Sequence, residues 1–153
     1  MRAQALRPVT HSQTQEGLSF VGAKAAFVCD GAILTYLRDD TPGLRFANWW
    51  DLPGGGREGA ESPKDCLLRE MEEEFGLSLP AEALIWEKAF PGMLNHRTTA
   101  WFFGGFLSLA QIAAIRFGDE GQRWEMMPLA AFRAHPRVIP AMRARAEAFL
   151  ARL

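Results

Sequence analysis

The spacing of apolar and polar residues changes along the chain, and the changes predict strands arranged around one long helix. Two apolar runs, at 20–29 and 32–37, are separated by Asp30-Gly31, a pair that favours a tight hairpin turn. Residues 39–48 carry turn formers and predict a loop. Further strands are expected near 49–52, 84–90, 98–107 and 122–127. The glycines that follow Pro53 are not expected to continue the strand before them.

The clearest helix is expected between Ser62 and Gly76. Ser62 is a good N-cap, Pro63 suits the first helical position, and Asp65 occupies the place of a capping-box acid. Gly76 is a natural residue to end a helix. The apolar residues of this helix fall on one face: Leu67, Leu68, Met71 and Phe75.

Two further helices are expected near the end of the chain, at 129–134 and 138–153. Together with the strands on both sides of the central helix, they predict one α/β domain with a mixed sheet, spanning 18–153. Residues 1–17 are polar and aperiodic, and they predict a flexible or irregular N-terminal arm.

Composition narrows the functional classes. The chain has 153 residues and a formal net charge of −1, so its overall charge gives no attraction to nucleic acid or to an anionic membrane. Neither Cys29 nor Cys66 belongs to a Cys/His cluster, which argues against a disulfide framework and a structural zinc site. No run of apolar residues is long enough to cross a bilayer. A cytoplasmic protein is expected.

Three carboxylates on the central helix carry the most informative pattern. Glu70, Glu73 and Glu74 are i, i+3 and i+4 neighbours, so their side chains should point to one patch beside the apolar stripe. Clustered carboxylates suit a hard cation such as Mg²⁺, with Mn²⁺ as the alternative. Arg69 precedes Glu73 by four residues and can pair with it. An acidic run alone is more often a solvated helix face, so the argument depends on the residues around it.

The loop before the helix completes the pattern. Gly54, Gly55 and Gly56 have no side chains to block a ligand, and their carbonyl groups are candidate metal ligands. Metal ions beside a phosphate chain neutralise it and activate water. The pattern therefore predicts attack of water on phosphorus rather than a covalent enzyme intermediate.

The full spacing runs from Gly55 through Glu61, Arg69-Glu70 and Glu73-Glu74 to Gly76-Leu77, and it resembles the Nudix box at every specified position. The resemblance implies an α/β/α sandwich with a mixed central sheet. It also implies Mg²⁺-dependent hydrolysis of a pyrophosphate bond in a nucleoside diphosphate linked to another moiety, a (d)NTP included. The chain length matches small MutT-like enzymes best.

The resemblance assigns roles within the box. Glu73 and Glu74 would be the principal metal ligands, and Glu70 would be a further ligand or the base that activates water. Gly54 would offer its carbonyl oxygen to the metal. Arg69 and Glu61 would orient the ligands.

Family members often add a carboxylate from a later loop, and Glu120 is the candidate here; the alternative is an ordinary exposed turn. For the substrate, a small nucleoside diphosphate derivative, the candidate binding residues are Arg45, Trp49 and Arg57. No specific binding of nucleic acid is expected. The sequence leaves open a homodimer, because apolar residues such as Phe102, Phe103 and Phe106 could serve either the core or a dimer contact. It also leaves open a non-catalytic sensor that binds a nucleotide on the same fold.

Overall fold

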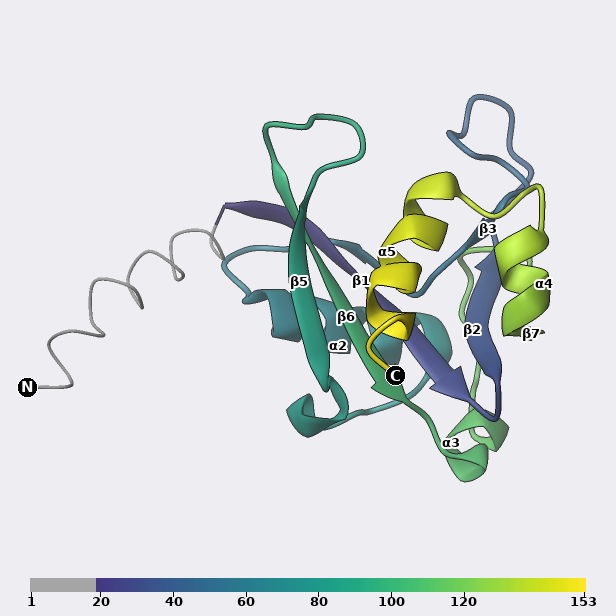
Figure 1. Cartoon of the computed structure of the whole chain (residues 1–153). Helices are drawn as coiled ribbons and strands as arrows, with labels where there is room; N and C mark the ends of the chain where they lie inside the picture. Colours follow the sequence, from purple (N-terminus) through teal and green to yellow (C-terminus); the bar gives the residue numbers. More distant parts are fainter. Residues whose placement is uncertain (1–18) are drawn as a thin grey trace, which may run out of the picture.

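The computed structural model describes residues 19–153, so the arm expected at 1–17 lies outside the described residues (Figure 1). The strands are β1 (Phe20–Cys29), β2 (Ala32–Leu37), β3 (Trp50–Asp51), β4 (Gly54–Gly56), β5 (Trp86–Pro91), β6 (Thr99–Phe106) and β7 (Arg123–Pro128). The helices are α2 (Pro63–Phe75), α3 (Leu109–Ala113), α4 (Leu129–Ala134) and α5 (Pro140–Leu150), with a 3₁₀ turn, η1, at Ala81–Ala83.

The strands form one mixed sheet. Its main path has the order β3-β2-β1-β6-β5, while β4 pairs with β1 and β7 pairs with β2. The long pairing between β1 and β6 is parallel, and the other pairings are antiparallel. This arrangement confirms the expected α/β fold with a mixed central sheet.

The first hairpin has the expected turn. Asp30 and Gly31 have φ angles of 48° and 74°, and two positive φ values in succession are what a type I′ turn requires. The register of β1 on β2 follows, with Val28 opposite Ile33.

The glycines after Pro53 do not continue β3, as expected, but the sequence did not predict that Gly54–Gly56 form a separate strand, β4, paired with β1. Glycine has a low strand propensity, but here the backbones approach closely. A Cβ on Gly54, whose φ is 124°, would lie 2.1 Å from the carbonyl oxygen of Ala23. The contact with β1, rather than propensity, therefore decides the conformation of this segment. The short elements η1 and α3 were also not expected from the sequence.

Helix α2 begins and ends as predicted. The hydroxyl of Ser62 accepts a hydrogen bond from the backbone N–H of Asp65 at 3.1 Å. Gly76 ends the helix in the left-handed conformation, with φ of 67°, and its N–H donates to the carbonyl of Glu72. On the apolar face, Leu67, Met71 and Phe75 are fully buried.

Two hydrophobic clusters lie on opposite faces of the sheet, and helices α2 and α5 cover them from opposite sides (Figure 1). Leu67 and Phe75 of α2 belong to the first cluster, and Met142 and Phe149 of α5 belong to the second. This is the expected α/β/α layering. Within residues 19–153, no helix combines the length and apolar character needed to cross a membrane.

The aromatic run of β6 divides between core and surface. Phe102 and Phe103 are completely buried inside the domain, so neither is available to a dimer contact. Phe106 is 51% exposed. A dimer contact through Phe106 stays a prediction.

Candidate catalytic site

The three candidate glutamates of α2, Glu70, Glu73 and Glu74, occupy two different environments. Glu70 and Glu74 are buried beneath β4, with exposed fractions of 8% and 7%. Glu74 Oε1 accepts a hydrogen bond from the backbone N–H of Gly54 at 3.3 Å. The side chain of Glu73 is 57% exposed. The helix therefore directs two carboxylates, not three, against the glycine strand.

Arg69 ties the loop before α2 to the helix. Its Nε and Nη2 atoms donate to the two carboxylate oxygens of Glu61 at 3.0 and 2.8 Å. Nη2 also donates to the carbonyl of Gly56 at 2.9 Å. Nη1 lies 3.2 Å from Oε2 of Glu70 and 3.1 Å from Oε1 of Glu73, so the predicted pairing of Arg69 with Glu73 is present.

Burial and charge shift the pKa values of these carboxyl groups in opposite directions. Hydrogen bonds from Arg69 lower the pKa of Glu61 to about 2. Burial raises the pKa of Glu70, although Arg69 opposes the shift. Burial, together with the charges of Glu70 and Glu120, raises the pKa of Glu74 to about 8 despite the opposing charge of Lys24. Two buried carboxylates near each other thus lack enough positive charge to stabilise both ionised forms.

Gly55 makes the close approach of Glu70 possible. A Cβ on Gly55 would lie 2.6 Å from Oε2 of Glu70, which is closer than atoms in contact can come. The same addition at Gly56 would meet nothing nearer than 3.9 Å. The carboxylate of Glu70 therefore fills the space that a side chain at Gly55 would take.

A second polar network adjoins these carboxylates and was missed in the sequence. Asp51 is 3% exposed, and its Oδ2 accepts hydrogen bonds from Lys24 at 3.1 Å, Arg38 at 3.1 Å and the hydroxyl of Tyr36 at 3.2 Å. Burial alone would lower the pKa of Lys24. The charges of Asp51, Tyr36 and Glu74 outweigh this effect, and the pKa of Lys24 is raised. The only sequence signal for this network was Asp51, an acidic residue between the apolar residues Trp50 and Leu52.

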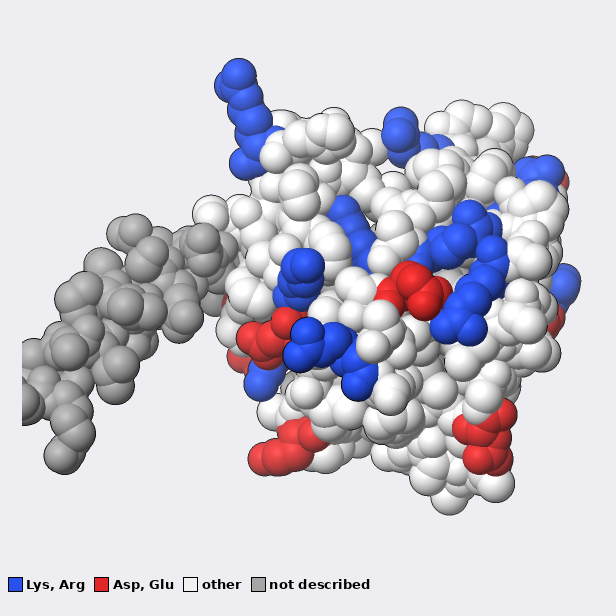
Figure 2. Space-filling view, viewed as in Figure 1, with Lys and Arg blue, Asp and Glu red and all other residues white. Residues whose placement is uncertain are grey.

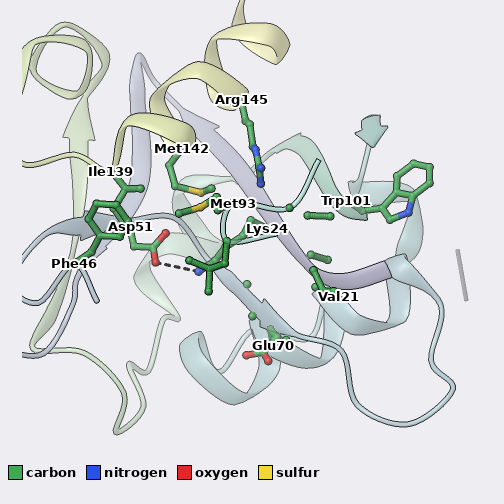
Figure 3. A pocket seen from close by; sticks show the side chains of 18 of the residues that line it. Val21, Lys24, Phe46, Asp51, Glu70, Met93, Trp101, Ile139, Met142 and Arg145 are labelled. Carbon is green, nitrogen blue, oxygen red and sulfur yellow. Dashed lines mark hydrogen bonds and ion pairs between the residues drawn. The ribbon is translucent and has the colours of Figure 1, made fainter. Parts of the chain in front are cut away.

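The two networks line one cavity of about 600 Å³ (Figure 3). At one end it is lined by the glycine strand together with Glu70 and Glu74. Lys24 and Asp51 are joined by an ion pair in its middle, and Met93 and Met142 lie near them. A cavity of this size accommodates a nucleotide-sized molecule.

The structure brings some of the predicted residues to the cavity and leaves others away from it. Glu120, in the loop before β7, is exposed and lines the cavity, as does Arg45. Trp49 packs against Phe46 and does not line it. Arg57 lies over the ring of Phe20, also outside the lining. The cavity itself therefore does not test contact of Trp49 or Arg57 with a substrate, which stays a prediction.

The carboxylate and carbonyl oxygens at the cavity are the kind of donors that bind a hard divalent cation, although their arrangement is not that of a complete metal site. Among residues 19–153, no three His, Cys, Asp or Glu side chains are placed together as a metal cluster. Arg69 holds Glu73 at the surface, on the side of Glu61. The buried pair Glu70 and Glu74 nevertheless provides oxygen donors whose negative charge Arg69 and Lys24 balance only in part, the chemistry that Mg²⁺ and Mn²⁺ prefer.

Comparison with known proteins agrees with this geometry. A curated 8-oxo-dGTP diphosphatase from Proteus vulgaris is 28% identical over 78 residues, 51% of this chain and 70% of the relative. An RNA pyrophosphohydrolase from Gluconobacter oxydans is 33% identical over 95 residues. The match to it spans 54% of this chain and only 54% of that relative.

Solved structures show the same fold. The MutT protein from Methanosarcina mazei superposes with a TM-score of 0.67 at 21% identity, covering 87% of this chain and 94% of that one. A bifunctional NMN adenylyltransferase/ADP ribose pyrophosphatase from Francisella tularensis, complexed with AMP and a Mn ion, has a TM-score of 0.64 at 22% identity. It is matched over 88% of this chain and 41% of its own. The sequence profile of the NUDIX domain matches residues 22–153, and the chain therefore belongs to the Nudix family of hydrolases.

Proposed function

We propose that this chain hydrolyses a pyrophosphate bond in a small nucleoside diphosphate derivative, a (d)NTP included, with Mg²⁺ or Mn²⁺ as cofactor. The observation that carries the proposal is the pair of buried carboxylates, Glu70 and Glu74, set against the glycine strand at one end of a nucleotide-sized cavity. The names of the relatives support a diphosphate substrate, and the Mn ion named for the Francisella tularensis structure supports a divalent cation.

In this proposal Glu70 and Glu74 hold the cation, with Glu73 and the carbonyl oxygen of Gly54 as further ligands. Glu73 would reach the cation only by leaving Arg69, and its exposed side chain is free to turn. When bound, the divalent cation neutralises the diphosphate and lowers the pKa of water. Arg69 keeps the loop and the helix at a fixed separation through Glu61 and Gly56.

The reaction needs a base as well as a cation. The oxygen of water bonds to one phosphorus atom, the bridging P–O bond breaks, and one water proton passes to a carboxylate. Glu70 is the first candidate base, as the alternative to its role as a ligand, because its carboxylate lies against Gly55 and lines the cavity. Glu120, on the loop at the same cavity, is the second candidate. Lys24 lines the cavity between its two ends and supplies positive charge to the substrate.

The experiment is a hydrolysis screen with Mg²⁺ over (d)NTPs, ADP-ribose, nucleotide sugars, dinucleoside polyphosphates and coenzyme A. Wild type is compared with Glu73→Gln/Glu74→Gln and with Glu72→Gln, a matched control because Glu72 is exposed on the same helix. Turnover of one class that is lost in the double variant and kept in the control is expected. Nucleotide binding without turnover would instead favour the sensor that the sequence left open.

A further inference from the structure

One buried cation in the cavity is not used by the proposed reaction. Arg145 of α5 is 8% exposed and lines the cavity from the side of the second hydrophobic cluster. Its Nη2 donates to the carbonyl of Pro91 at 2.7 Å, and its guanidinium lies 5.1 Å from the centre of the Phe90 ring. Across the part of the chain that the structure describes, no carboxylate pairs with Arg145.

A buried arginine without an anion is unusual, because arginine is seldom buried unless it is paired. Burial lowers the pKa of Arg145 below its ordinary value, but a guanidinium group keeps its charge in proteins. One carbonyl and one aromatic face satisfy only part of its five N–H donors. The remaining donors and the charge favour an anion that enters from solution.

The surroundings of Arg145 also favour an anion. A second hollow, of about 450 Å³, shares Arg145 and Arg45 with the main cavity and adds His96. Its lining includes no acidic residue, and Met93 and Ile139 supply apolar contacts. Basic side-chain atoms are visible between the β5–β6 loop and α5 (Figure 2).

Arg145 is separated from the carboxylate end of the cavity. Glu70 belongs to α2 and Arg145 to α5, and these helices cover opposite faces of the sheet. Figure 3 shows the two side chains on opposite sides of Lys24. A group bound at Arg145 would therefore lie across Lys24 from a diphosphate held at Glu70.

We infer that Arg145 binds a phosphate group of the substrate that is separate from the diphosphate to be cut. This inference rests on the proposed function and makes it more specific: the substrate class is a nucleoside diphosphate derivative with a further phosphate on its sugar or on the linked moiety. The planar guanidinium fork matches two phosphate oxygens, which a lysine would meet only as a point charge. Phosphate is favoured over the edge of a neutral base because, among residues 19–153, no carboxylate pairs with the charge of Arg145.

The test uses pairs of compounds that differ by one phosphate: coenzyme A with dephospho-coenzyme A, and NADPH with NADH. Binding to the full chain is measured by calorimetry without added metal, so that no turnover occurs. We expect wild type to bind the phosphorylated member of at least one pair tenfold or more tightly, the effect of one charge-assisted contact. In Arg145→Gln and Arg145→Met the ratio should fall to about one. Met keeps an unbranched side chain at this position and removes the charge.

Arg152→Gln is the matched control, because it removes an exposed positive charge from the same end of the chain. It should keep the wild-type ratio. Equal affinities within both pairs in wild type would overturn the inference, as would a preference that survives both Arg145 substitutions. An equal loss of affinity for both members would also overturn it, since Arg145 would then contact the shared diphosphate. If no compound is hydrolysed in the Mg²⁺ screen, but wild type still binds the phosphorylated member of a pair more tightly and the Arg145 variants do not, the proposed hydrolysis is rejected. Phosphate binding at Arg145 would then still stand.

Discussion

The carboxylate of Glu61 receives two hydrogen bonds from Arg69, at 3.0 Å from Nε and 2.8 Å from Nη2. Glu61 precedes the helix and Arg69 lies in its second turn, so the pair fixes the loop on the helix. Because Nη1 of Arg69 also lies within 3.2 Å of Glu70, the orientation of a candidate metal ligand depends on this contact. Ion pairs of this two-bonded kind are more specific in geometry than single contacts.

Arg69→Lys should weaken both the fold and the reaction, because an ammonium group cannot bond both oxygens of Glu61 and reach Glu70 at once. We expect a loss of about 1–3 kcal/mol in the free energy of unfolding, the range for hydrogen bonds to charged groups. kcat/KM should fall by about tenfold or more. Urea unfolding and steady-state kinetics measure the two effects, and Arg152→Lys is the control at an exposed position. Unchanged values of both quantities would remove Arg69 from the site.

Gly55→Ala should lower activity and leave the fold largely intact. The three atoms nearest to the added Cβ all belong to the side chain of Glu70, the closest at 2.6 Å, so this carboxylate must move. A displacement of about 1 Å at a catalytic group can cost about 10²-fold in rate. Gly56→Ala is the control, because its nearest atom would be 3.9 Å away. Equal activities of the two variants would show that the position of Glu70 does not matter to the reaction.

Much of the fold could be predicted from local chemistry. The Asp30-Gly31 turn, the Ser62 cap and the Gly76 stop depend on neighbours within a few residues, and all three are confirmed. The strand at Gly54–Gly56 could not be predicted, because it depends on backbone contact with β1, about 30 residues earlier in the chain. Tertiary contact outweighed the low strand propensity of glycine.

The sequence indicated the helix part of the site, and outside the helix it indicated Gly54, Arg45 and Glu120, which line the cavity. Helical spacing placed Glu70, Glu73 and Glu74 on one patch, but it could not show that Arg69 holds Glu73 at the surface. The cavity residues Lys24 and Arg145 come from β1 and α5, and no local pattern joins them to the helix. The order of strands in the sheet brings Lys24 and Arg145 to the same cavity as the carboxylates of the helix.

The metal-free protein should lose stability as the pH rises towards 8. Burial raises the pKa of Glu74 from its ordinary value of 4.5 to about 8, so between these values the folded state binds more protons than the unfolded chain. Stability then falls with rising pH. Calorimetry in a chelator should show a falling Tm over this window, a smaller fall in Glu74→Gln, and recovery on addition of Mg²⁺. If Tm falls equally with pH in wild type and in Glu74→Gln, groups other than Glu74 cause the fall.

Glu120→Ala tests the loop before β7. Glu120 lines the cavity, and its charge contributes to the raised pKa of Glu74, so its removal should lower kcat and alter the Mg²⁺ dependence of the rate. Asp119→Ala is the control, because Asp119 is exposed and does not line the cavity. If rate and Mg²⁺ dependence stay unchanged in Glu120→Ala, the loop is an ordinary exposed turn.

The most direct measurement is the rate of hydrolysis as a function of Mg²⁺ concentration for wild type, Glu74→Gln and Glu72→Gln. The two variants remove one charge each from the same helix, at a buried and an exposed position. We predict that Glu74→Gln lowers kcat by about 10²-fold or more, because it removes a group that helps to stabilise the charge of the transition state. The kcat of Glu72→Gln should stay close to that of wild type. Near-normal activity of Glu74→Gln, or hydrolysis that continues without a divalent cation, would contradict a metal-dependent site on this helix.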